Sequence, residues 1–304
     1  MTADKKLLIL GASGFIGRHM IQRLDSEAVI ATHFSASLTG GVRFDAISED
    51  LSAIVRPDDI WHCMILNADS HPDSCARDAE RSNSLNVEST KRVISQLSDW
   101  DIPFTFASSE MVFDGTLHEA TETTQPNPIM LYGRQKLAIE QFLMQDYPDA
   151  PWTIMRLGKV FGSAAQNEKL FAGWIDAIER GERIRIAEDQ IFSPIYVEDI
   201  VSACLTAADV GLRGLYHLCG DTAYSRIDLL YMTIKSIRRY RPVEPVIETC
   251  SIDDFNLLEP RPKDVSMRPD KIVKAIGITI TPTPQICDMI VDQYYQRRGA
   301  SETS

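Results

Sequence analysis

Short apolar runs alternate with amphipathic stretches through the first half of the chain. Five runs have the length and the continuous apolar character of strands buried on both faces of a parallel sheet: 6–10, 28–33, 59–66, 103–107 and 152–157. Between them, apolar residues recur at helical spacing, which predicts helices over 15–25, 76–98 and 131–147. Alternation of this kind is typical of the α/β class, in which a doubly wound parallel sheet carries helices on both faces.

The second half of the chain has a mixed pattern. Periodic apolar residues predict four further helices, over 168–180, 197–208, 226–239 and 284–297. We therefore expect a first domain over 1–157, to which a segment near 190–208 returns, and a smaller mixed α/β lobe over 158–304. A chain of 304 residues is long enough to bury a large core in such a two-lobed unit.

The first apolar run continues directly into the turn Gly-Ala-Ser-Gly-Phe-Ile-Gly and then into a helical pattern. Glycines let the backbone turn sharply and approach a pyrophosphate, and a helix N-terminus offers free N–H groups and the positive end of its dipole. This context predicts a dinucleotide-binding Rossmann domain over 1–157. The turn residues expected to contact the cofactor are Gly11, Ser13, Gly14, Phe15, Ile16 and Gly17.

Tyr132 and Lys136 are four residues apart in the predicted helix 131–147, so their side chains share one face. A nearby cation favours the ionised form of a phenol, and a Tyr so placed can give a proton to a carbonyl that receives hydride. The same spacing also occurs on ordinary amphipathic helices. Ser109 favours the chemical interpretation, because it ends a predicted strand at the sheet edge where ligands bind.

The glycine turn, the strand-end Ser and Tyr-x-x-x-Lys, in this order, resemble the extended short-chain dehydrogenase/reductase family over nearly the whole chain. Segments 108–115, 189–196 and 261–267 are similar to one branch of it, the dTDP-4-dehydrorhamnose reductase-like proteins, and Asp-Gln-x-x-Ser-Pro is fairly specific to that branch. The resemblance implies reduction of a 4-keto nucleotide sugar with NAD(P)H. It implies catalytic roles for Ser109, Tyr132 and Lys136, the last two also contacting the cofactor.

The end of the second predicted strand bears on the choice of cofactor. NAD-specific members of this fold often carry an acid there, whereas segment 31–37 has none. A 2′-phosphate would meet no repulsion, so NADP is the preferred cofactor and NAD is the alternative. Arg18, His33 and Ser35 are expected to bind that phosphate. By similarity to the family, Asp45 is expected at the adenine, and Asn67 and Ala68 are further expected cofactor contacts.

The residues expected on the substrate side are His71, Ser109, Glu110, Met111, Lys159 and Arg261. Two of these positions depart from the rhamnose-forming reductases, which typically have Asp-Tyr where this chain has Glu-Met, and a Trp where it has Lys159. The loss of an aromatic platform and the gain of a cation should change the sugar or the anionic group that is accepted. The candidates for a local basic pocket are Lys159, Arg185, Arg261 and Arg268.

Two other functions stay open. A nucleotide-sugar dehydratase or epimerase could keep its cofactor as NAD. Dehydratases of the wider family place two acids after the strand-end hydroxyl, and this chain has only Glu110, whereas epimerisation can reuse the same Ser, Tyr and Lys. The third function is that of a non-catalytic NADP-binding regulatory subunit, like the one of methionine adenosyltransferase, which belongs to the same branch.

Composition and charge limit the kinds of partner and the cellular location that we expect for this chain. The formal net charge of −12 argues against nucleic acid, and no apolar run approaches the ~20 residues of a membrane span. The start of the chain shows no apolar region of a signal peptide, and the six cysteines are scattered, so we expect a cytoplasmic protein. The histidines lack partners at metal-ligand spacing, which predicts no catalytic metal. A homodimer through helices 76–98 and 131–147 is expected from related enzymes.

Overall fold

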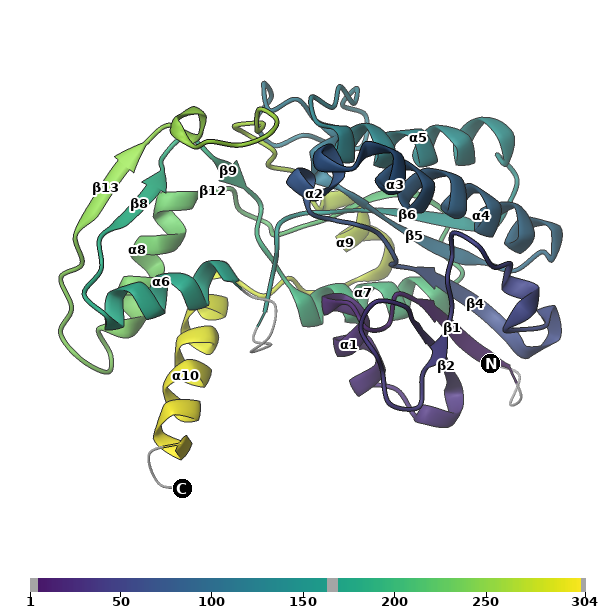
Figure 1. The fold of residues 1–304 in the computed structure, drawn as a ribbon, viewed down its shortest axis with the longest axis horizontal. Helices are drawn as coiled ribbons and strands as arrows, with labels where there is room; N and C mark the ends of the chain where they lie inside the picture. Colours follow the sequence, from purple (N-terminus) through teal and green to yellow (C-terminus); the bar gives the residue numbers. More distant parts are fainter. Residues whose placement is uncertain (1–4, 163–168, 302–304) are drawn as a thin grey trace.

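A parallel sheet of seven strands forms the larger part of the computed structural model, which describes residues 5–162 and 169–301 (Figure 1). In hydrogen-bonded order, the strands are β11 (Gly214–Leu218), β6 (Trp152–Leu157), β5 (Phe104–Ser109), β4 (Ile60–Ile65), β1 (Lys6–Leu10), β2 (Val29–His33) and β3 (Val42–Arg43). Each neighbouring pair is parallel. The five predicted apolar runs are strands of this sheet.

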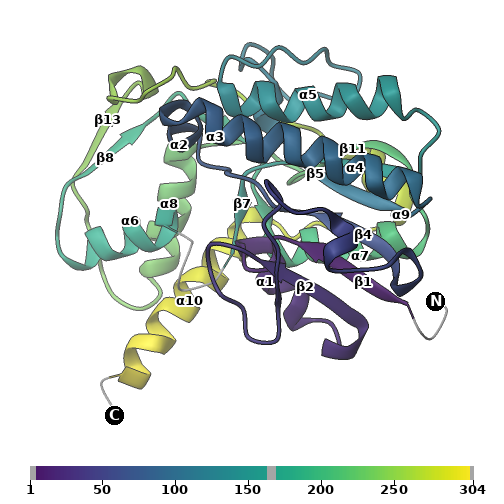
Figure 2. The ribbon, with the colours of Figure 1, turned by 45° about the vertical axis from the view of Figure 1, so that its right-hand side comes forward.

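Helices cover both faces of the sheet (Figures 1 and 2). The side chains of successive residues of β1 point to opposite faces of the sheet, as strand geometry requires. Leu8 and Leu10 pack in one cluster with α4 (Ser89–Asp99) and α5 (Leu131–Asp146). Leu7 and Ile9 pack in another cluster, whose helices are α1 (Phe15–Gln22), α7 (Val197–Asp209) and α9 (Asp270–Ile276). The predicted doubly wound Rossmann fold is confirmed.

The single helix predicted over 76–98 is wrong. The chain forms α2 (Pro72–Arg77), α3 (Ala79–Asn83), a π-helical turn (Ser84–Glu88) and then α4. The interruption is at Asp78, with φ −132° and ψ 76°, whose carboxylate accepts a hydrogen bond from the N–H of Arg81 at 3.1 Å. An Asp at this position caps a new helix, and apolar periodicity does not detect such a cap.

The helix that returns to the sheet is found where it was expected, but the returning strand lies later in the chain. The helix expected over 197–208 is α7, which packs against α1, but the returning strand is β11, beyond the range 190–208. The strands near residue 190 pair elsewhere: β9 (Ile191–Phe192) with β12 (Tyr224–Ser225), and β10 (Ile195–Tyr196) with β7 (Val160–Phe161). The division of the chain at residue 157 stays a prediction.

The smaller lobe mixes helices and strands, as predicted, and stands to the left of the sheet in Figure 1. Its strands β8 (Ile184–Ala187) and β13 (Ile247–Cys250) are parallel partners. They pack with α6 (Lys169–Glu179), α8 (Arg226–Ile237) and α10 (Thr283–Ser301) around a core that includes Phe171, Ile186 and Leu230. Residue 168, where one helix was predicted to begin, lies outside the described residues.

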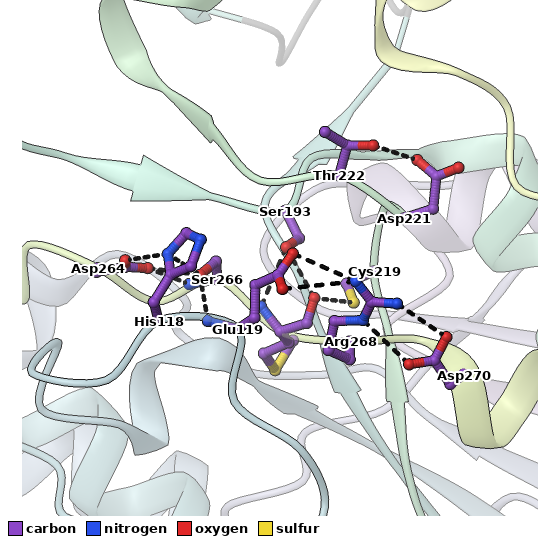
Figure 3. A network of polar contacts seen from close by, with 11 residues as sticks. His118, Glu119, Ser193, Cys219, Asp221, Thr222, Asp264, Ser266, Arg268 and Asp270 are labelled. Atoms are coloured by element: carbon purple, nitrogen blue, oxygen red, sulfur yellow. Dashed lines mark hydrogen bonds and ion pairs between the residues drawn. The ribbon is translucent and has the colours of Figure 1, made fainter.

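The segment 264–270, which follows β13, forms polar contacts with earlier parts of the chain (Figure 3). The hydroxyl of Ser193 donates to the carbonyl of Met267 at 2.8 Å and accepts from its N–H at 3.0 Å. Nearby, Asp264 binds His118 at 2.6 Å and Ser266 at 2.6 Å. The Ser of the Asp-Gln-x-x-Ser-Pro motif thus fixes the path of the chain after β13. None of the helices in the described ranges has the length and apolar character that a membrane span requires.

Candidate active site

A cavity of about 610 Å³ lies between the carboxyl edge of the sheet and the smaller lobe. One wall is formed by the turn after β1, the ends of β5 and β6, and the first turns of α5. The other wall comes from α6, β8, the start of α8 and residues 252–261. Ligands of open α/β sheets bind at this edge, so the cavity is the candidate active site.

The glycine turn forms a cradle at one end of the cavity. Gly11 has φ 82°, a conformation that favours glycine. A Cβ on Gly17 would lie 2.6 Å from Cα of Ala12, so only glycine lets α1 begin this close to β1. The N-cap residue, Gly14, supplies no capping side chain, and the first turn of α1 has no acid. Free N–H groups and the dipole of α1 therefore fit the pyrophosphate of a dinucleotide.

Some of the predicted cofactor-binding residues line the cavity, and others do not. Those that line the cavity are Gly11, Gly14, Phe15, Ile16, Gly17, Ala68, Tyr132 and Lys136. Those that do not are Ser13, Arg18, His33, Ser35, Asp45 and Asn67. Nε of Arg18 donates to the carbonyl of Ser13 at 2.7 Å, and the carboxylate of Asp45 accepts from Ile47 and Ser48 within its own turn. The roles of these residues toward the cofactor stay predictions.

Ser109, Tyr132 and Lys136 meet in the cavity. Ser109 ends β5, and the other two lie one turn apart on α5. The hydroxyl of Ser109 is hydrogen-bonded to the Tyr132 hydroxyl. Nζ of Lys136 donates to the carbonyl of Ala107 at 2.7 Å and lies 5.8 Å from the centre of the Tyr132 ring. The three predicted catalytic groups thus form one polar cluster at the end of β5.

Gly133 allows this closeness. A Cβ on Gly133 would collide with the carbonyl oxygen of Met111, which follows β5. The first turn of α5 can therefore approach the end of β5 only with glycine there. The N-terminus of α5 also receives a carboxylate from the smaller lobe: Glu259 accepts from the N–H of Leu131 at 3.0 and 3.2 Å. Both contacts fix the turn that carries Tyr132.

Burial governs the protonation of the cluster. Burial raises the pKa of Tyr132, and the hydrogen bond from Ser109 opposes that shift only in part. The direction is opposite to the lowering by Lys136 that the sequence predicted. Burial also lowers the pKa of Lys136 to about 8, although Glu140 favours its charge. Because desolvation disfavours both charged forms, Tyr132 is a neutral phenol at neutral pH and so can donate a proton.

The predicted substrate-side residues Ser109, Glu110, Met111, Lys159 and Arg261 line the cavity. Glu110 is only 3% exposed, and its burial raises the pKa of the carboxyl to about 8, against the lowering effect of the charge and the N–H of Lys159. Its Oε2 has no hydrogen-bond partner among the described residues. The side chain of His71 is 83% exposed and does not line the cavity.

The basic candidates differ in their surroundings. Arg185 lines the cavity, as Lys159 does. Arg261 also lines it but forms an ion pair with Asp73 of α2, so its charge is compensated. Arg268 does not line the cavity; it is paired with Glu119 and Asp270 in the network of Figure 3. The placement of Arg268 in a basic pocket is therefore wrong, because two carboxylates hold it elsewhere.

Sequence reasoning missed several residues of the site. The smaller-lobe wall includes Trp174, Gln190, Arg226 and Phe255. Gln190 belongs to the recognised Asp-Gln motif, but nothing in the sequence pairs it with Arg226, since their contact depends on the antiparallel β9–β12 pair. Asn86, in the π turn, does not line the cavity, but it holds a neighbouring loop through contacts that the sequence also did not reveal.

The side chain of Asn86 holds the loop that follows β4. Its Oδ1 accepts from the N–H of Asp69, and its Nδ2 donates to the carbonyl of Asp69, both at 2.9 Å. Nδ2 also donates to Gln135 of α5 at 2.8 Å.

Within the described ranges, no group of three or more His, Cys, Asp or Glu side chains could hold a metal ion.

Comparisons with known proteins agree with this geometry. The model of a protein family described as "RmlD substrate binding domain" matches residues 5–295. A probable low-salt glycan biosynthesis reductase of Haloferax volcanii is 26% identical over 72% of this chain and 76% of its own. A dTDP-4-dehydrorhamnose reductase of Mycolicibacterium smegmatis is 25% identical over 90% and 81%. Methionine adenosyltransferase 2 subunit beta of Xenopus tropicalis is 24% identical over 74% and 70%.

Solved structures show the same fold. A dTDP-4-dehydrorhamnose reductase of Bacillus anthracis in complex with NADP superposes with a TM-score of 0.75 at 19% identity, covering 97% of this chain and 99% of that one. A UDP-glucuronic acid 4-epimerase of Bacillus cereus in complex with UDP-glucuronic acid and NAD gives a TM-score of 0.81 at 19% identity, covering 96% and 99%.

Proposed function

Because the chain belongs to the RmlD substrate binding domain family, and thereby to the NAD(P)-dependent oxidoreductases of the extended short-chain dehydrogenase/reductase type, we propose that it reduces a keto group on a nucleotide-linked sugar. The observation that carries the proposal is the cluster of Ser109, Tyr132 and Lys136 in the cavity. Its phenol is neutral, which a proton donor in a reduction requires.

The glycine turn, Tyr132 and Lys136 would hold NADP or NAD, and the bound nicotinamide supplies the hydride. Ser109 donates a hydrogen bond to the oxygen of the substrate ketone. Tyr132 gives its proton to the alkoxide that develops there. Lys136 orients the ribose of the cofactor and keeps a positive charge near the reacting oxygen. Positioning and charge stabilisation in the cavity supply the rate gain.

We prefer NADP as the cofactor. The end of β2 and the residues after it, His33 to Ser37, contain no acid that would repel a 2′-phosphate. NAD is the alternative, since solved structures of this fold hold NADP in one case and NAD in another.

The test follows NADPH and NADH oxidation at the nicotinamide absorbance band with 4-keto sugars linked to dTDP, UDP, GDP and CDP. Wild type should consume cofactor with one substrate class, and Tyr132→Phe should lose roughly 100-fold or more in turnover while it still binds NADPH. Tyr231→Phe, an exposed tyrosine of α8, is the matched control and should behave as wild type. Full turnover by Tyr132→Phe would contradict the proposed mechanism.

Two relatives favour other outcomes of the same test. The first alternative is an epimerase that keeps its NAD, because the solved 4-epimerase structure has the same fold. NAD that copurifies tightly with the protein, with no net oxidation of added NADPH or NADH, would support this alternative. The second alternative is a regulatory subunit, because the chain is similar to methionine adenosyltransferase 2 subunit beta. Stable association with a synthetase-like partner, with no turnover on any keto sugar, would favour that function over a reductase.

A further inference from the structure

Glu140 lies on the face of α5 that carries the proposed catalytic pair. It follows Tyr132 and Lys136 at the same interval of four residues, so the three side chains share one face of the helix. Like the other two, it is bonded to the end of β5: the hydroxyl of Ser108, the neighbour of Ser109, donates to Oε1 of Glu140 at 2.5 Å. Glu140 does not line the cavity, so it acts on a bound substrate only through its neighbours.

The carboxylate of Glu140 is paired with a buried arginine. Its side chain has an exposed fraction of 0%, and that of Arg156, in β6, has 2%. Nε of the guanidinium donates to Oε1 at 3.0 Å, and Nη2 donates to Oε2 at 2.6 Å. His217 of β11 lies 3.4 Å from the guanidinium, and burial lowers its pKa to about 3, so it adds no charge at neutral pH. The bidentate geometry holds the carboxylate in one orientation.

Stability alone does not account for this pair. Two opposite charges lose their hydration on burial, and apolar side chains of similar volume in their place are often as stable or more so. The packing of α5 on the sheet comes from apolar residues such as Ile139 and Leu143. The negative charge of Glu140 therefore has to be explained by what lies near it on the helix.

Lys136 is a buried amine whose hydrogen-bond partner is uncharged. The residue is 5% exposed, and its Nζ donates to the carbonyl of Ala107. Burial lowers the pKa of Lys136 to about 8, and Glu140, one turn further along α5, is the neighbour that opposes this lowering most. Because desolvation favours the neutral amine, the charge of Lys136 near neutral pH depends on an opposite charge close by.

Other titratable groups around the pair do not supply that charge. Burial raises the pKa of the Cys75 thiol, in α2, to about 11, so the thiol is neutral at neutral pH. Burial likewise raises the pKa of Glu110, after β5, to about 8. Asp69, in the loop after β4, acts on the phenol: after burial, its charge is one of the smaller causes that raise the pKa of Tyr132.

We propose that Glu140, oriented by Arg156 and Ser108, is a positioning residue that keeps Lys136 positively charged when the catalytic tyrosine gives up its proton. Its charge stabilises the ammonium of Lys136, and the ammonium in turn stabilises the alkoxide that develops in the cavity. The effect on turnover rests on the proposed function. The charge of Lys136 itself can be measured without any turnover.

The first experiment titrates Lys136 by NMR in protein labelled with isotopes at lysine, and Lys136→Met identifies its signal. Glu140→Gln should lower the pH at which the amine titrates by roughly one unit, because the charge that opposes its desolvation is lost. Glu140→Asp keeps the charge and should restore most of the wild-type titration. Asp146→Asn, which removes an exposed acid from the same helix, is the matched control and should leave the titration unchanged.

A double variant separates the charge of Glu140 from that of Arg156. Glu140→Gln alone leaves a buried guanidinium without its partner, which costs stability. Glu140→Gln combined with Arg156→Met removes both charges at similar volume, so it should fold and keep most of the shift in the titration of Lys136. A titration in the double variant equal to that of wild type would overturn the inference, because Glu140 would then only neutralise Arg156.

The pH profile of turnover tests the same charge in the reaction. Near pH 8, about half of Lys136 is charged in wild type and about a tenth should be in the Glu140 variants, so kcat should fall roughly 5-fold there and stay close to wild type near pH 6. An equal loss of kcat at both pH values, with an unchanged titration, would mean a purely structural role and overturn the inference. A shifted titration of Lys136, with no hydride transfer to any keto sugar in wild type, would support the inference and reject the reductase.

Discussion

At the scale of single residues, burial decides more about this site than local charge pairing does. Tyr132 and Lys136 were predictable as a pair, because helical spacing puts them on one face. Their protonation was not, because it depends on how deeply the fold buries them: the pKa of Tyr132 is raised and that of Lys136 is lowered to about 8. Glu110 follows the same rule, with a pKa of about 8.

Glu110 gives a test of this burial that does not depend on activity. Its pKa is about 8 in the folded chain and near 4.5 when exposed, so the unfolded state loses its proton first as pH rises. Stability from this carboxyl is therefore fully present below pH 4.5 and is lost by about pH 8. Glu110→Gln, which stays neutral, should be within about 1 kcal/mol of wild type near pH 5 and more stable by a few kcal/mol near pH 9.

Urea unfolding of both proteins at the two pH values measures the difference. Glu182→Gln is the control, since Glu182 is an exposed acid paired with Arg180. Because Lys136 titrates in both proteins, its contribution cancels in the comparison. Equal stability of wild type and Glu110→Gln near pH 9 would mean that the carboxyl is solvated and ionised at neutral pH.

At the scale of elements, strands were easier to predict than helix boundaries. A strand buried on both faces is a continuous apolar run, so β1 and β4 could be read directly. The interruption at Asp78 and the π turn around Asn86 depend on hydrogen bonds to single side chains, which apolar periodicity does not record. Likewise, Arg226 reaches the cavity only because β12 pairs with β9, a contact between distant segments that no local pattern specifies.

The helix that carries Tyr132 depends on the other lobe. Its N-cap, Met130, supplies no capping side chain, and its first turn has no acid. The carboxylate of Glu259 takes that place, bonded to the N–H of Leu131 at 3.0 Å and to Arg134 at 3.2 Å. Glu259→Gln should cost about 1 kcal/mol of stability, because a charge at a helix N-terminus is lost.

The same variant should reduce turnover more than cofactor affinity, since Tyr132 lies in the first turn and the glycine turn is untouched. Turnover, NADPH affinity and urea unfolding are measured together. Glu248→Gln, which removes an exposed acid of β13, is the control. A loss of turnover no larger than in that control, at equal stability, would show that Glu259 does not position Tyr132.

At the scale of the whole molecule, polar side chains buried on the strands of the sheet and on α5 make the free energy of unfolding depend on pH. Glu140 and Arg156 form a buried ion pair at 2.6 Å between α5 and β6, and Ser108 donates to the same carboxylate. His217 of β11 contacts Arg156 at 3.4 Å, and burial lowers its pKa to about 3. His62 in β4, bonded to Thr105 at 2.9 Å, has its pKa lowered by burial to about 4.

These two histidines predict acid sensitivity. An unfolded histidine takes up its proton near pH 6.5, whereas the folded ones stay neutral until about pH 4 and 3. Between these limits the unfolded state binds more protons, so stability falls as pH falls. Each histidine should remove about 2 kcal/mol between pH 6.5 and pH 5. Urea unfolding at these pH values should show a shallower slope in His62→Asn and an unchanged slope in His71→Asn, whose side chain is exposed. An unchanged slope in His62→Asn would mean that His62 is protonated within the folded sheet.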